Sequence, residues 1–354
     1  MGLKILHSAD WHLGSPYKGF SEQQRRFLKE EQKKIPGKIT DLCLREDCDM
    51  MLIAGDLFDG DPKQETVDLV KKELARSGVP VLIAPGNHDF YETGSIWQRE
   101  LWPENVFVFT GDLESVTIQG LQCRIYGAAF RSMDCPALLE GFRAQGEETY
   151  RIAVLHGDPL QRNSPYNPIA STQVRESGLH YLALGHVHKA GAFRAGETMC
   201  AWPGCPMGRG WDETGDKGVC IVNVDEQTTV RAVSLQTVRF HDMTVHVDAD
   251  AQSAVEAALP AVSGDDFYRI TLTGDVNVDL QRLQKQFSRF PNLELRDRTE
   301  SPVEVWEDAD KDSLEGIYFG MLRKVMTENP DLAEEVQLAA EISRKLLRGR
   351  EVRL

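Results

Sequence analysis

Short apolar runs of strand length recur along the first two thirds of the chain, and each is followed at once by polar residues. The runs are LKIL, MMLIA, VPVLIA, RIAVL and YLAL, and they lead into HSADWH, GDLFD, PGNHD, HGD and GHVH. Runs this short and rich in Val, Ile and Leu are typical of buried strands. SEQQRRFLKEEQKKI and PKQETVDLVKKELARSG, which lie between the first three runs, have helical spacing. The alternation predicts an α/β core with largely parallel strands.

Polar side chains gather where these predicted strands end. Sites in such sheets form beyond the carboxyl ends of the strands, so we expect all five polar clusters to converge on one edge. The residues concerned are Asp10, His12, Asp56, Asp59, Asn87, His88, Asp89, His156, His186 and His188. Oxygen and imidazole donors without thiolate suit manganese, iron or zinc, and so many donors indicate two cations rather than one. The absence of cysteine at these ends disfavours a structural zinc site.

The order of these motifs resembles a known family. The series D-x-H, GD-x-x-D, GNHD, H and GH-x-H resembles the calcineurin-like metallophosphoesterases over residues 1 to about 225. ILHSADWHLG, GDLFDG, PGNHD and LALGHVH are similar, more narrowly, to the SbcD and YhaO-like kind of bacterial DNA-repair exonuclease. WPGCPMGRGWDETGDKGVCIVNVD resembles a later segment of that family, with Cys205 in place of its usual serine. The resemblance implies a four-layer αββα fold, a β-sandwich flanked by helices, with a small α+β capping domain and C-terminal helices.

The resemblance also implies a role for each motif residue. Asp10, His12 and His188 would hold a first metal ion, Asn87, His156 and His186 a second, and Asp56 would bridge both. These ions would be two divalent cations, manganese first, with iron or zinc as alternatives. His88 resembles the family's general acid or phosphate-stabilising histidine.

Two carboxylates near these ligands have other parts in the pattern. In related phosphatases the position of Asp59 orients the acidic histidine, and a carboxylate on one ring nitrogen fixes the tautomer of the other. The alternative for Asp59 is an ordinary loop cap. We expect Asp89 to cap the following segment, FYETGSIWQREL, rather than to bind metal.

Charge and cysteine content restrict the setting in which the chain works. The net charge is −15, from 55 acidic and 40 basic residues, whereas proteins that bind nucleic acid over their whole surface are usually basic. Seven cysteines without a CxxC pair indicate free thiols in a reducing cytosol. No run is long enough for a membrane helix. GxGxxG and GxxxxGK loops are missing, so the sequence has no sign of an ATP site of its own.

The pattern divides the chain into three parts: a metallophosphoesterase domain over 1–238, an α+β domain over 239–300, and a linker with C-terminal helices over 301–354. The middle part predicts strand, helix, strand, helix, strand, and it either caps the site or stabilises the chain. Asn329-Pro330 separates two amphipathic helices. These helices either pack on their own chain or present an apolar face to a partner.

The leading functional hypothesis is a metal-dependent DNA nuclease subunit of a repair complex, an exonuclease and also a candidate endonuclease. The resemblance implies DNA and an SbcC-like coiled-coil ATPase as partners, and it is compatible with a homodimer. Two alternatives stay open: a phosphoesterase acting on small phosphodiesters or phosphomonoesters, and a non-catalytic scaffold. The full set of ligand residues argues against the scaffold, and the cap-like domain and terminal helices argue against a small substrate.

Overall fold

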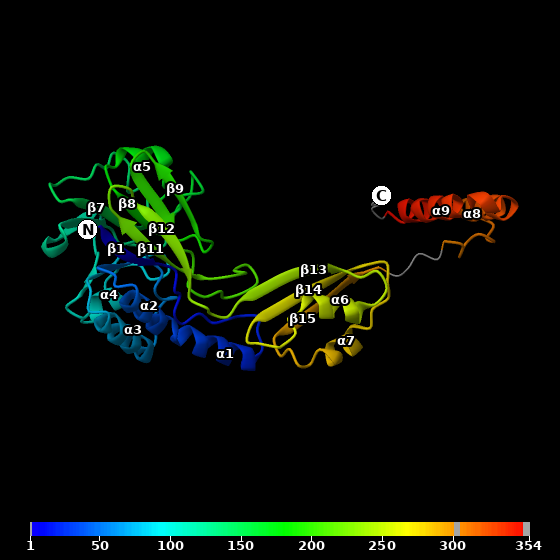
Figure 1. Cartoon of the computed structure of the whole chain (residues 1–354), viewed down its shortest axis with the longest axis horizontal. Helices are drawn as coiled ribbons and strands as arrows, with labels where there is room; N and C mark the ends of the chain where they lie inside the picture. The colour runs from blue at the N-terminus through cyan, green and yellow to red at the C-terminus, as the bar shows by residue number, and fades with distance from the viewer. Residues whose placement is uncertain (1, 301–304, 350–354) are drawn as a thin grey trace. The chain divides into compact units, whose positions relative to one another are not determined.

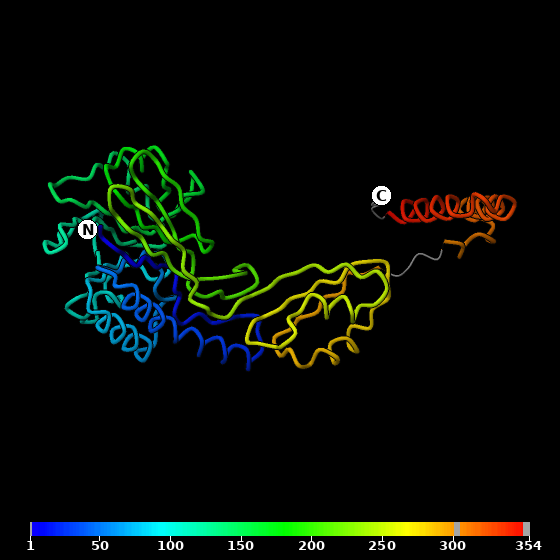
Figure 2. The backbone as a smooth tube through the Cα atoms, in the orientation of Figure 1, coloured from blue at the N-terminus to red at the C-terminus, as the bar shows by residue number. Residues whose placement is uncertain are grey.

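A computed structural model describes residues 2–300 and 305–349 of the chain. It contains two compact units (Figures 1 and 2): the first holds the chain up to His241 together with Asp265–Phe267, and the second holds the rest. Residues 301–304 of the predicted linker and the terminal residues 350–354 lie outside the described part. Among the described helices, none combines the length and apolar character that crossing a membrane requires.

The first unit is built on two six-stranded mixed sheets flanked by helices (Figure 1). One sheet has the order β12-β11-β1-β2-β3-β4. Its strands are β1 (Leu3–Ser8), β2 (Met50–Ile53), β3 (Val81–Ile83), β4 (Val106–Val108), β11 (Gly218–Val224) and β12 (Thr229–Ser234). Strands β1 to β4 run parallel, while β11 is antiparallel to β1 and to β12.

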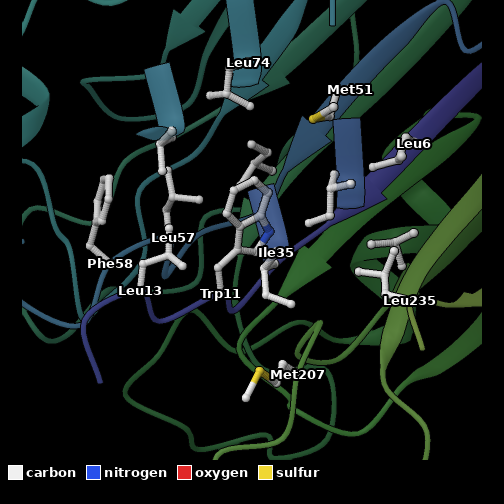
Figure 3. Packing of buried hydrophobic residues seen from close by; sticks show 14 of the residues in the cluster. Leu6, Trp11, Leu13, Ile35, Met51, Leu57, Phe58, Leu74, Met207 and Leu235 are labelled. Carbon is white, nitrogen blue, oxygen red and sulfur yellow. The ribbon is translucent and has the colours of Figure 1, made fainter. Parts of the chain in front are cut away.

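Helices of this unit are α1 (Glu22–Lys33), α2 (Ile35–Arg45), α3 (Gln64–Arg76), the short α4 (Ile96–Arg99) and α5 (Ser171–Glu176). The helical spacing had predicted α1 and α3 but not a separate α2. Pro36 lies in the first turn of α2, where its missing N–H is not needed by the helix. Residues Ile35, Leu74 and Met51 belong to one buried apolar cluster that joins these helices to the first sheet (Figure 3).

The second sheet has the order β5-β6-β7-β8-β10-β9. Its strands are β5 (Glu114–Ile118), β6 (Cys123–Gly127), β7 (Tyr150–His156), β8 (Tyr181–Gly185), β9 (Gly191–Ala195) and β10 (Thr198–Trp202), with a 3-10 turn, η1 (Gln119–Leu121), between β5 and β6. The inner strands β6, β7, β8 and β10 are parallel, and the two edge strands are antiparallel to their neighbours.

The five predicted strands are β1, β2, β3, β7 and β8, and they do not share one sheet. Three belong to the first sheet and two to the second, so the expectation of a single sheet edge was wrong. Apolar side chains such as Ile5 and Val154 join the two sheets in one buried cluster. The side chain of His7 meets the hydroxyl of Tyr181 inside this core, with Nδ1 and Oη 2.7 Å apart. The ends of β2 and β7 meet across the sandwich, where His156 Nδ1 lies 2.9 Å from the carbonyl oxygen of Ala54.

The second unit contains a three-stranded sheet with two helices, in the predicted order of strand, helix, strand, helix, strand. The elements are β13 (Phe240–His246), α6 (Ala251–Ala258), β14 (Phe267–Gly274), α7 (Leu280–Gln286) and β15 (Leu293–Thr299). The sheet order is β13-β14-β15, with β14 and β15 parallel. Val255 and Leu283 bring both helices into one apolar cluster with the strands.

Two helices follow, as the spacing predicted: α8 (Leu314–Glu328) and α9 (Ala333–Leu347), separated by η2 (Pro330–Leu332). Buried Phe319 of α8 and Ala340 of α9 lie in one small cluster. The guanidinium of buried Arg344 lies 3.8 Å from the centre of the Phe319 ring and donates to Asp308. The two helices thus form a pair with a small core of their own.

Candidate metal centre

The loop after β1 places two predicted ligands on either side of a buried tryptophan. Trp11 packs in the apolar core beside Leu13 (Figure 3), and its indole N–H donates to Ser8 Oγ at 2.8 Å. Asp10 and His12 have positive φ angles of 54° and 45°. Non-glycine residues rarely adopt this conformation, and it persists where surrounding contacts over-determine it. Here those contacts are bonds from the N–H groups of Asp10 and His12 to the carbonyls of Gly55 and Asp56.

The loops after β2 and β3 pack directly on each other. Asp56, with φ of 50°, accepts from the backbone N–H of His88 through Oδ1 at 2.9 Å. A Cβ on Gly86 would lie only 2.2 Å from that same oxygen, so the glycine of GNHD is required by the close approach of the Asp56 carboxylate. The backbone of the turn after β3 thus packs directly against the Asp56 carboxylate.

The second sheet supplies imidazoles from the ends of β7 and β8. His156 Nδ1 donates to the carbonyl of Ala54 at 2.9 Å, which leaves its Nε2 3.0 Å from Asn87 Oδ1 and 3.4 Å from Asp56 Oδ2. His186 has a φ of 92°, and its N–H donates to both oxygens of Asp10. The ring of His186 lies 5.2 Å from that of His156, centre to centre.

The predicted ligands come together at one place. Three sets of three side chains each have ligand atoms within 4.8 Å of one another: Asp10, His12 and His188; His12, Asp56 and His88; and Asp10, Asp56 and His156. Asn87 and His186 belong to none of these sets, but both lie beside His156. Asn87 Oδ1 is 3.0 Å from His156 Nε2, and the ring of His186 packs against that of His156. His88 was expected to face the substrate rather than to bind a metal. Because it belongs to one of these sets, binding of a metal by His88 is an alternative. The metal content of a His88 variant distinguishes the two roles.

The charges in this cluster are those of a cation site. Burial raises the pKa of Asp10. Burial also works against ionisation of Asp56, yet the imidazoles of His156 and His12 hold its pKa well below the ordinary value. Burial lowers the pKa of His12 to about 3, which favours the neutral imidazole that metals bind. His156 resists protonation by burial, but Asp56 and Asp10 raise its pKa to about 9.

Nitrogen lone pairs in the cluster also face a shared point. The Nε2 atoms of His12 and His188 lie 3.2 Å apart. His188 Nδ1 lies 2.7 Å from the carboxylate of Glu213, so Nδ1 carries the proton and Nε2 keeps its lone pair. Two buried carboxylates and several imidazole nitrogens in this arrangement fit divalent cations of the manganese, iron and zinc type.

His88 and Asp59 form a more accessible pair beside the cluster. The His88 side chain is 41% exposed, and its Nδ1 lies 3.1 Å from Asp59 Oδ1. This hydrogen bond raises the pKa of His88 above its ordinary value. Asp59 is itself held by the hydroxyl of Ser15 at 3.1 Å. The pair thus leaves one imidazole nitrogen of His88 available to a ligand.

Asp89 does not cap the segment that follows it, and that prediction was wrong. Its carboxylate accepts from the N–H groups of Gly86, Leu57 and Phe58 at 2.8, 2.7 and 3.1 Å. Burial and the charge of Asp56 raise its pKa to about 7. Asp89 therefore ties the β2 loop to the β3 loop and positions the residues that carry the cluster.

Comparison with known proteins identifies the family. A model of the calcineurin-like phosphoesterase family matches residues 3–190, just over half of the 354 residues. The chain belongs to the calcineurin-like phosphoesterase family. The predicted family is thereby confirmed. We refer to the first unit from here on as the phosphoesterase unit.

Individual relatives support the SbcD and YhaO-like kind within this family. The uncharacterized metallophosphoesterase YhaO of Bacillus subtilis is 32% identical over 258 residues, which are 68% of this chain and 61% of YhaO. The SbcD component of the nuclease SbcCD of Staphylococcus epidermidis is 21% identical over 90% of this chain and 93% of its own. The DNA double-strand break repair protein Mre11 of Aeropyrum pernix is 27% identical over 57% and 53%. The chain thus spans about three fifths of YhaO and half of this Mre11.

Two residues of the phosphoesterase unit were missed by the sequence reasoning. Glu213 is buried, and its carboxylate accepts from His188 Nδ1 and, at 2.7 Å each, from the backbone N–H and Nη2 of Arg209. Burial works against its ionisation, but these bonds hold its pKa well below the ordinary value. Both residues lie in the segment GRGWDE. The presence of acidic and basic residues in this segment does not indicate that they contact His188, which lies 21 positions before Arg209.

Proposed function

We propose that this chain is a metal-dependent DNA nuclease subunit that hydrolyses phosphodiesters with two divalent cations, manganese being the first candidate. The observation that carries the proposal is the cluster of buried carboxylates and imidazoles beside the accessible His88–Asp59 pair. The names of two relatives, a nuclease component and a DNA double-strand break repair protein, support DNA as the substrate. We further propose that the domain over 239–300 positions DNA.

The residues divide into those that hold cations and those that act on the substrate. We assign Asp10, His12 and His188 to one ion, Asn87, His156 and His186 to the other, and Asp56 to both. Bound cations would supply Lewis acidity that neutralises phosphate oxygens and activates water. His88 then gives a proton to the leaving oxygen of the phosphodiester. Asp59 orients His88 by accepting from Nδ1, which keeps Nε2 available for that transfer.

The substrate class is tested by one assay on the purified full chain loaded with manganese. Linear DNA and bis-p-nitrophenyl phosphate are supplied in parallel, and chelated protein serves as the control. Hydrolysis of both substrates agrees with the proposal. Hydrolysis of the small diester alone, with DNA left intact even at low salt and high DNA concentration, would favour a small-molecule phosphoesterase, and hydrolysis of neither would favour a scaffold.

A cytoplasmic location and a protein partner complete the proposal. All seven cysteines are free thiols in the structure, as predicted, and free buried thiols are typical of a reducing compartment.

The net charge of −15 makes the chain a poor binder of DNA by itself, since duplex affinity comes largely from neutralised phosphates. A coiled-coil ATPase of the SbcC-like kind would supply the remaining contacts to the DNA phosphates.

The helix pair α8–α9 is our candidate docking surface for that ATPase. Phe319 lies on the side of α8 that packs against α9. Exposed apolar residues spaced three and four positions apart follow the same helix, namely Leu314, Ile317 and Met321, and Leu314 is 86% exposed. Exposed apolar residues at this helical spacing suit insertion into a partner's groove. These three residues are not part of the small core that α8 shares with α9.

Replacing Ile317 and Met321 together by glutamate should abolish co-purification with the coiled-coil ATPase. Loss of two apolar anchors is expected to weaken association by roughly 30-fold or more. Lys285→Glu, at an exposed position of α7, makes the same change in net charge away from this surface and is the matched control. Hydrolysis of bis-p-nitrophenyl phosphate should be unchanged in both variants. Full partner binding by the double variant would rule out this surface.

A further inference from the structure

Arg209 lies beside the metal centre with only part of its guanidinium engaged by the protein. Nε and Nη2 donate to Glu213 Oε1 at 3.1 and 2.7 Å, and Nη2 lies 3.0 Å from His188 Nδ1. Nη1 has no hydrogen-bond partner in residues 2–300 and 305–349, and it is not among the buried unpartnered atoms. The side chain is 21% exposed, whereas that of Glu213 is only 4% exposed. One edge of the guanidinium is therefore buried on Glu213, and Nη1 remains for a ligand.

The backbone around Arg209 is held so that this geometry is preformed. The N–H of Arg209 donates to Glu213 Oε2 at 2.7 Å, and the N–H of Glu213 donates to the carbonyl of Gly210 at 3.1 Å. A second tie joins the N–H of Gly215 to the carbonyl of Phe240 at 3.0 Å. A guanidinium fixed along one edge loses little conformational entropy when its other N–H groups bind an anion.

Arg209 lies on the same side of the metal centre as the residues that we assign to the substrate. Its Nη2 lies 3.0 Å from Nδ1 of His188, and the Nε2 atoms of His188 and His12 lie 3.2 Å apart. The ring of His12 in turn lies 4.7 Å from that of His88, centre to centre. His88 and Asp59 are the accessible pair to which we assign work on the leaving group. A planar guanidinium is well matched to phosphate oxygens, more so than an ammonium group.

We propose that Arg209 is a substrate-binding residue, which donates from Nη1 to an oxygen of the phosphoryl group at the metal centre. The inference rests on the proposed function for the identity of that group, and the ligand class is a phosphodiester or the phosphate ion itself. The competing role is purely structural, in which Arg209 only neutralises Glu213. Lysine distinguishes the two, because it keeps the charge beside Glu213 but cannot reach Glu213 and a phosphate together.

The test is calorimetric titration of inorganic phosphate into the manganese-loaded full chain, with manganese affinity measured separately on the same proteins. Arg209→Lys should bind phosphate about tenfold more weakly and Arg209→Met about 10–100-fold more weakly, as expected for a lost charge-assisted hydrogen bond. Manganese affinity of Arg209→Lys should stay within about threefold of wild type, since Glu213 keeps a cation. Arg231→Met, which removes an exposed arginine paired with Glu46, is the control for charge alone and should match wild type.

Selective weakening of phosphate binding in Arg209→Lys supports the inference. Three results would overturn it: phosphate affinity of Arg209→Lys equal to wild type, an equal loss of phosphate and manganese affinity in this variant, or no phosphate binding by wild-type protein. The titration needs no turnover. A chain that hydrolyses neither substrate would therefore refute the proposed function while the role of Arg209 is still decided.

Discussion

Asp56→Asn protein is expected to hydrolyse phosphodiesters no faster than metal-free wild type, the largest effect we expect of any single substitution. Oδ2 of Asp56 lies 3.6 Å from His12 Nε2 and 3.4 Å from His156 Nε2, so this carboxylate is placed between two groups of ligands. Asparagine keeps the shape but removes the negative charge that two cations would share. Metal content after manganese loading and the turnover of bis-p-nitrophenyl phosphate provide the measurement.

The same variant should be less stable than wild type even when metal is removed. The imidazoles of His156 and His12 hold the pKa of Asp56 well below its ordinary value, so the ionised carboxylate stabilises the folded chain at neutral pH, and asparagine removes that charge. Ligand binding raises unfolding temperature by mass action, and this metal-dependent rise should be lost in Asp56→Asn.

Asp89→Asn is the matched control for this experiment, because it changes another buried carboxylate near the centre. It should keep its response to manganese and lose about 1–3 kcal/mol of stability through weakened bonds to the loop N–H groups. An Asp56→Asn protein with normal metal content and turnover would show that the bridging assignment is wrong.

His88→Ala is expected to keep its metal while turnover falls by roughly 10²–10⁴, the usual size of a general-acid contribution. The side chain is 41% exposed and is hydrogen-bonded to Asp59, which is itself partly exposed, so its removal leaves little buried surface unpaired. Asp59→Asn should give a milder defect of the same kind, because His88 stays but loses its orientation. Metal content and turnover are measured together on each variant.

The choice of substrate separates general-acid loss from other defects. A nitrophenolate departs readily as an anion, whereas the alkoxide of a DNA strand needs a proton. The defect of His88→Ala should therefore be larger on DNA than on bis-p-nitrophenyl phosphate. His246→Ala, at an exposed histidine in the second unit, should match wild type. Loss of metal from His88→Ala would instead place His88 among the ligands, as its proximity to His12 and Asp56 permits.

Local pattern accounts for much of the fold. Short apolar runs predicted strands β1, β2, β3, β7 and β8 because a buried strand needs consecutive apolar residues, and their ends follow directly in the chain. Helical spacing predicted α8 and α9, and the proline between them marked the break. Helix α2 was missed as a separate element because it begins almost directly after the end of α1.

The sequence by itself determined which residues stand at the strand ends and which chemical types they offer, because those features are local. Tertiary structure decided that two sheets, not one, bring them together, since the partners of a strand depend on the whole chain. It also decided that Glu213 and Arg209 support His188, and that His7 meets Tyr181 in the core. These contacts join positions 21 to 174 residues apart, and no periodicity along the chain records a contact between side chains that distant.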